Sequence, residues 1–195
     1  MKQRTLWITR TAVLLALVLV AQFVGKLVPA GAVIAGPFSV SQLITGSLVN
    51  LMLAIAAGVV GLGSGVTVGV LSAILATLLG VGPIFPQITP LIALGNAILV
   101  AVLWGTFRAA DRLRGGVELA ARLGGVVLAA AVKCAFLWLT VPWMLGLIPE
   151  VKPQQAQMLT IMFSWPQAVT ALAGGLIGLV VIPPLKKALK TGRTF

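Results

Sequence analysis

The chain has 195 residues, of which 59% are hydrophobic and only 9% are charged. Because a soluble domain usually carries about 25% charged residues, this composition excludes an ordinary soluble protein. A lipid bilayer can accept this much apolar surface, and the length suits about six spans of roughly 20 residues each. We therefore expect one transmembrane domain over residues 1–195.

Six apolar segments follow one another along the chain. We expect helices over about 8–27, 41–60, 64–80, 89–107, 119–141 and 156–182. The prolines of "GVGPIFPQITP" separate the third segment from the fourth. Pro142 is expected to end the fifth helix, and Pro183 and Pro184 the sixth, because proline lacks the backbone N–H that a helix needs.

The boundary between the second and third segments carries the weakest signal. The stretch "AAGVVGLGSGV" has neither a charge nor a proline. We expect a tight turn near Gly61–Gly65, because two spans use the whole of residues 41–80. One long re-entrant segment is the alternative.

The formal net charge is +11, and the positions of the basic residues indicate a topology rather than a nucleic-acid partner. With six spans both termini share one side of the membrane. That side then holds eleven of the fourteen Lys and Arg residues, namely Lys2, Arg4, Arg10, Arg108, Arg112, Arg114, Arg122, Lys186, Lys187, Lys190 and Arg193. The other side has only Lys26 and Lys152. The expected fold is all-α, with six transmembrane helices in one bundle and both termini cytoplasmic.

Small residues recur four positions apart in several segments, which lets helices approach closely. In the third, fifth and sixth segments, for example at Gly65 and Gly69 or at Gly174 and Gly178, we expect internal packing. Ala12 and Ala16 in the first segment form another such pair. This pair serves either internal packing or the docking of another membrane protein.

Polar side chains inside apolar spans are costly and usually face the protein interior or a water-filled cavity. The expected topology places one group of them, with a tryptophan, in the outer half of the membrane or at mid-depth. We select this group as the candidate substrate-binding residues: Lys133, Asn96, Gln167, Ser164, Trp138 and Gln87. Trp138 has the alternative role of an interfacial aromatic anchor. Further polar residues within spans are Gln22, Gln42, Thr45, Ser47, Asn50 and Thr170.

Lys133 interrupts the apolar stretch "AAAVKCAFLWLTVPW". No Asp or Glu lies in any expected span, so no internal ion pair can neutralise its charge. An anionic ligand would do so. The alternatives are that Lys133 extends to the membrane surface or bonds a carbonyl group. If its charge is uncompensated, Lys133→Met should fold at least as well as the wild type.

Several functional classes lack their usual residues. The chain has no histidine and one cysteine, Cys134, which excludes a Cys/His metal site and an internal disulfide. It has no phosphate-binding loop of the G-x-x-x-x-G-K-[ST] type, and no span carries the carboxylate or histidine that proton-coupled carriers use. We expect no enzymatic activity and no cofactor, but a solute site without a motor of its own.

Three stretches resemble the substrate-binding S component of energy-coupling factor (ECF) vitamin transporters. They are "AVLLA" from Ala12 to Ala16, similar to the A-x-x-x-A motif of that family's first helix, "FSVSQLITGSLVNLMLAIA" over 38–56, and "PLIALGNAIL" over 90–99. The size and six-span layout are also similar. The resemblance implies that the chain binds a vitamin or related micronutrient from outside, and topples in the membrane to release it inside.

The resemblance also implies partners. A membrane coupling protein and two cytoplasmic ATPases would supply the energy, and Ala12 and Ala16 would contact the coupling protein. In that family the ligand lies in the outer half, between the last three helices, where Asn96, Lys133, Ser164 and Gln167 are expected. Two other functions stay open at this point. One is a structural or scaffold membrane protein, such as a cell-shape or assembly factor, and the other is a stand-alone channel or small-solute carrier.

Overall fold

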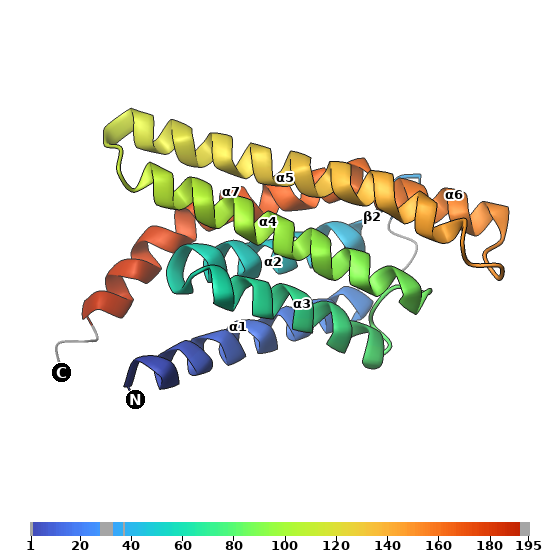
Figure 1. Ribbon diagram of the computed structural model, residues 1–195, viewed down its shortest axis with the longest axis horizontal. Coiled ribbons are helices and arrows are strands. Elements are labelled where there is room, and N and C mark those ends of the chain that lie inside the picture. The colour runs from blue at the N-terminus through green and yellow to red at the C-terminus, as the bar shows by residue number, and fades with distance from the viewer. Residues whose placement is uncertain (1, 28–32, 37, 192–195) are drawn as a thin grey trace.

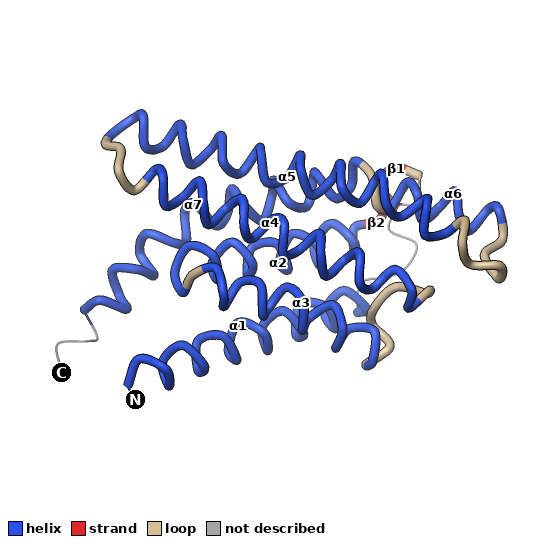
Figure 2. The backbone as a smooth tube through the Cα atoms, viewed as in Figure 1, coloured by secondary structure: helices blue, strands red, loops and turns tan. Residues whose placement is uncertain are grey.

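The computed structural model describes residues 2–27, 33–36 and 38–191, which form a bundle of helices with one short two-stranded hairpin (Figures 1 and 2). The all-α fold class is confirmed. In chain order the elements are α1 (Lys2–Leu27), β1 (Val33–Ala35), β2 (Phe38–Ser39), α2 (Val40–Ile55), the π-helical turn η1 (Ala56–Val60), α3 (Leu62–Leu78), the 3₁₀ turn η2 (Pro86–Ile88), α4 (Thr89–Ala110), α5 (Gly115–Leu145), α6 (Pro153–Met162) and α7 (Trp165–Thr191).

Five helical stretches are long and apolar enough to cross a membrane, and α3 is shorter. The five are Gln3–Leu27, Val40–Val60, Pro86–Ala110, Gly115–Leu145 and Pro153–Leu189. The 17 residues of α3 extend about 25 Å, somewhat less than a hydrocarbon core of about 30 Å. Large apolar side chains such as Val180, Leu139 and Val127 are exposed on the outside of the bundle. These features fit a multi-pass membrane protein.

The two ends of the described chain lie at the same end of the bundle (Figure 1). The start of α1 and the end of α7 are found there, whereas α6 lies at the opposite end. Helix α7 packs mainly on α2, α4 packs between α3 and α5, and α1 packs on α2 and α3. The interior therefore receives side chains from helices far apart in the sequence.

The turn expected between the second and third segments is confirmed, at Gly61. Helix α2 continues into η1 and ends at Gly61, whose φ of +126° is a conformation that glycine adopts without strain. The Gly61 N–H donates to the Ala56 carbonyl at 2.8 Å, and α3 begins at Leu62. The structure therefore has two helical segments joined by Gly61 here, and not the one long re-entrant segment considered as the alternative.

The expected packing role of small residues is confirmed where α7 meets α2. A Cβ atom on Gly174 would lie 2.5 Å from the Ser47 carbonyl oxygen and 2.6 Å from the Leu51 nitrogen. Only glycine permits so close an approach of two backbones. This contact brings α7 near enough to α2 for their polar side chains to meet.

Three expectations about the extent of the helices are wrong. The sixth segment is divided into α6 and α7 by a break at Phe163 and Ser164, and Pro142 lies inside α5 rather than at its end. Pro183 and Pro184 likewise lie inside α7, whose C-terminal part bends away from the bundle in Figure 1. Each proline removes one backbone hydrogen bond, and a helix in an apolar environment can continue past that loss while its neighbours hold it.

Candidate functional site

Lys133 of α5 is the centre of a buried polar cluster. Its side chain is 3% exposed, and its Nζ donates to Asn50 Oδ1 of α2 and to Asn96 Oδ1 of α4, each at 2.8 Å. The ammonium group thus has two neutral oxygen partners, which the sequence analysis did not anticipate. An ammonium group has three N–H donors, and the described residues supply a partner for two of them.

The two asparagines extend this cluster to two more helices. Asn96 Nδ2 donates to the Gly69 carbonyl of α3 at 3.2 Å, and Asn50 Nδ2 donates to Thr170 Oγ1 of α7 at 3.4 Å. Five helices are therefore connected through one buried lysine. Asn50, Asn96 and Thr170 are each at most 4% exposed, so water competes little for these bonds.

Lys133 also lines a cavity of about 270 Å³. Asn96 and Gln167, two other residues selected from the sequence, line the same cavity, together with Gln22, Thr45 and Asn50. The apolar part of the wall includes Val49, Ile92, Met162 and Phe163. Polar groups in an otherwise apolar cavity are typical of a small-molecule site, and the volume suits a small metabolite.

The break between α6 and α7 covers one side of this cavity. Gln42 Nε2 and Gln167 Nε2 each donate to the Met162 carbonyl at 3.2 Å, which fixes the end of α6 over the cavity. Ser164 lies beside the cavity rather than in its wall. Its Oγ donates to the Ile161 carbonyl at 2.7 Å, and its own carbonyl accepts a bond from Cys134 Sγ at 3.2 Å. Ser164 therefore shapes the break.

Two selected residues lie away from the cavity. Trp138 is 57% exposed on the outside of α5, and Gln87 is exposed in η2. Trp138 follows Lys133 by five positions, so the two side chains are about 140° apart around the helix. The sequence analysis used depth in the membrane alone, and the helical rotation would have separated these two residues.

Three residues of the cavity wall were identified in the sequence as polar but not selected. These are Gln22 of α1, Thr45 of α2 and Asn50 of α2. Gln22 Oε1 and Thr45 Oγ1 are buried and have no hydrogen-bond partner among the described residues. Their polarity inside an apolar span could have marked them as candidate site residues. The sequence did not show that α1 and α2 line the same cavity as α4, α5 and α7.

Ala12 and Ala16 lie on the exposed face of α1. The opposite face is the one that packs on the bundle, where Leu14 and Val18 are buried and Thr11 Oγ1 donates to Ser64 Oγ of α3 at 2.8 Å. Internal packing within the described residues thus uses the other side of this helix. The exposed pair is open to lipid or to a partner protein.

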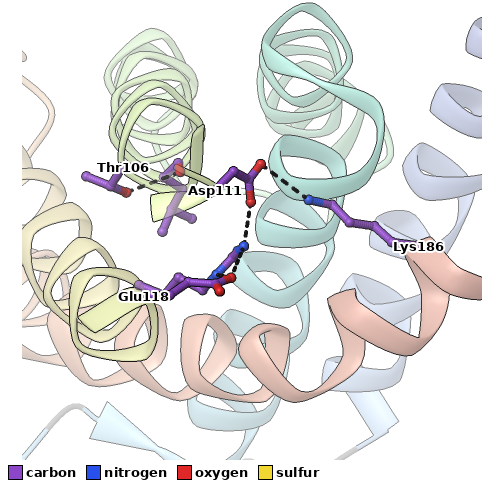
Figure 3. Close-up of polar contacts among 6 residues, drawn as sticks. Thr106, Asp111, Glu118 and Lys186 are labelled. Atoms are coloured by element: carbon purple, nitrogen blue, oxygen red, sulfur yellow. Dashed lines mark hydrogen bonds and ion pairs between the residues drawn. The ribbon is translucent and has the colours of Figure 1, made fainter. Parts of the chain in front are cut away.

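Two of the three acidic residues, Asp111 and Glu118, lie at the end of the bundle where α1 begins. Asp111 lies between Lys186 of α7 and Glu118 of α5 (Figure 3). Arg122 donates to Asp111 and to Glu118, and the distance between Lys186 Nζ and Asp111 Oδ2 is 3.9 Å. This network joins the loop between α4 and α5 to α7. Among the described residues no three His, Cys, Asp or Glu side chains are placed to hold a metal ion.

Comparison with protein-family models, with curated proteins and with solved structures finds no match for this chain.

The geometry reverses the expectation that Lys133→Met folds as well as the wild type. Without the ammonium group, the Oδ1 atoms of Asn50 and Asn96 lose their donors inside the bundle. We expect a loss of about 1–3 kcal/mol in the free energy of unfolding, measurable as a lower apparent Tm in detergent. The double variant Lys133→Met with Asn50→Leu removes one of the two unpaired oxygens and should recover part of this loss. A single variant as stable as the wild type would contradict the role of this cluster.

Proposed function

We propose that this protein is the substrate-binding S component of an ECF-type importer, which captures a small, anionic vitamin or related micronutrient from outside the cell. The observation that carries the proposal is the cavity of about 270 Å³ with a buried lysine in its wall, inside a bundle of apolar helices. A scaffold protein needs no such cavity. The resemblance of "AVLLA", "FSVSQLITGSLVNLMLAIA" and "PLIALGNAIL" to that family supports the same function.

The charge of the substrate is inferred from Lys133. Its two bonds to asparagine oxygens provide no negative charge, and no carboxylate lies within 4.0 Å of its Nζ among the described residues. A carboxylate or other anion that accepts the third N–H would compensate the buried charge. Asn50 and Asn96 hold the ammonium group in place for that contact.

The proposed topology has six membrane-spanning helices, with α3 as the third, and both termini in the cytoplasm. It is supported by the common location of the start of α1 and the end of α7 (Figure 1) and by the basic residues near that end, such as Arg108, Arg122 and Lys186. The cavity then lies toward the outer side, since Pro83 and Met162 in its wall come from the opposite end of the bundle.

Single-cysteine labelling tests this topology. In a Cys134→Ala background, we expect Gln3→Cys and Lys187→Cys to resist a membrane-impermeant thiol reagent in intact cells, because the cytoplasm shields them. Gln154→Cys, at the start of α6, should react, because α6 lies at the other end. Labelling of residue 3 or 187 in sealed cells would overturn the six-span arrangement.

The partners would be a membrane coupling protein and two cytoplasmic ATPases, with Ala12 and Ala16 as the docking face. We expect Ala16→Trp to abolish co-purification with these partners and uptake, while the purified variant still retains its solute, because a bulky ring holds two helices apart. Val127→Trp places the same ring on an exposed position of α5 and should leave both properties unchanged. Uptake by Ala16→Trp at the wild-type rate would exclude this face.

Mass spectrometry of the solute released from the denatured, detergent-purified protein tests the function itself. We expect one small anion at close to one equivalent. Lys133→Met should bind the released solute at least about tenfold more weakly, because a buried charge pair is lost. Lys187→Met, an exposed residue of α7, should bind as the wild type does. A wild-type protein that releases no solute, and binds none from a cell extract, would contradict the proposal.

A further inference from the structure

A second hollow in this bundle lies toward the two chain ends, away from the cavity beside Lys133. It is a groove of about 310 Å³ between α1, the end of α2 with η1, and α7. Val13 and Leu17 line it from α1, and Leu185 and Leu189 line it from α7. The two leucines of α7 follow the prolines inside that helix, where it bends away from the bundle (Figure 1). The groove thus lies between α1 and the bent part of α7.

The groove runs along the helices. On α1 its wall reaches from Thr9 to Leu17, a rise of about 12 Å, and on α2 and η1 it reaches from Met52 to Val60. An acyl chain in a bilayer lies in the same direction as membrane-spanning helices. With this length and volume, the groove is too narrow for a second helix about 10 Å across, whereas a single acyl chain fits.

Arg10 is the basic residue in the wall of this groove. Its aliphatic stem lies along the apolar wall, and its guanidinium group has no hydrogen bond or ion pair with another described residue. Side chains on a helix tilt toward its N-terminus, so this group lies toward the end of the bundle where α1 begins. A positive charge is therefore placed at one end of an apolar groove.

The acidic residues of the chain do not neutralise this charge. Asp111 and Glu118 both accept bonds from Arg122, and Asp111 also lies near Lys186 (Figure 3). Glu150 follows α5 at the opposite end of the bundle. Among the described residues Arg10 is therefore left without a counter-charge, at an end of the molecule that carries a surplus of basic side chains.

We propose that this groove binds one anionic phospholipid, with an acyl chain between α1 and α7 and its phosphate group at Arg10. A guanidinium group can donate two parallel hydrogen bonds to a phosphate. A headgroup with net negative charge is favoured because the basic surplus attracts it, whereas the ammonium group of a zwitterionic lipid already compensates its own phosphate. This site goes beyond the proposed function and does not depend on the cavity beside Lys133.

The first test compares two lipids with the same acyl chains, anionic phosphatidylglycerol and zwitterionic phosphatidylcholine. Each is titrated onto delipidated protein in detergent and counted by native mass spectrometry. The wild type should bind one phosphatidylglycerol about fivefold more tightly than phosphatidylcholine, as expected for one basic residue near the headgroup. Arg10→Met keeps the apolar stem and should bind both lipids equally, and Arg10→Lys should keep part of the preference. Arg112→Met removes an exposed charge from the loop after α4 and should leave the preference unchanged.

The second test fills the groove. Leu17→Trp keeps Arg10 but places an indole ring where the acyl chain would lie. It should weaken binding of both lipids by at least about fivefold, since burial of even two methylene groups contributes more than this. Val127→Trp adds the same ring on an exposed position of α5 and should bind as the wild type does. Inorganic phosphate in large excess should not displace the lipid, because it has no acyl chain.

Four outcomes would overturn this proposal. Equal wild-type affinity for the two lipids, or an equal loss of preference in Arg10→Met and Arg112→Met, would show that only general surface charge acts. Displacement of the lipid by inorganic phosphate would make the site an anion site. A lower apparent Tm of lipid-free Arg10→Met would show that Arg10 holds the fold.

The last outcome concerns a different occupant. If Leu17→Trp leaves lipid binding unchanged but abolishes co-purification with partner proteins, the groove belongs to a partner and the proposal fails. Release of a solute by the wild type and its weaker binding by Lys133→Met are measured separately, so the proposed function stands or falls independently of this lipid site.

Discussion

The burial of one ammonium group among apolar helices is the constraint on which the rest of this structure depends. Lys133 can lie there because Asn50 and Asn96 place their oxygens 2.8 Å from its Nζ. Those asparagines are in turn held by Gly69 and Thr170, so α2, α3, α4, α5 and α7 must keep one fixed arrangement. The cavity lies against this cluster, and its polar wall is consequently rigid.

Helix α1 connects the cavity to the outer surface of the bundle. Gln22 is in the cavity wall, whereas Ala12 and Ala16 face outward on the same helix. In the function proposed here, a substrate in the cavity and a partner bound at Ala16 would lie against the same helix. Thr11 bonds to Ser64 of α3, and Lys26, near the end of α1, bonds to the Gly80 carbonyl just after α3, so α1 is held at two points along its length.

The sequence predicted some elements well because their signals are local. The turn at Gly61 and the start of α4 near Pro90 follow from the conformational properties of glycine and proline. The break between α6 and α7 was missed because its signal is weak. Bonds from Gln42 and Gln167 to the Met162 carbonyl hold this break, and those side chains come from α2 and α7.

The sequence by itself determined that the chain is a bundle of apolar helices and that Lys133, Asn96 and Gln167 are polar exceptions within it, because composition and periodicity follow from the residues alone. It could not determine which helix faces meet. Trp138, on the same helix as Lys133, is exposed on the outside, while Gln22 and Thr45 line the cavity. Only the tertiary structure decided this, because the neighbours of a buried side chain are set by the packing of helices that are distant in the sequence.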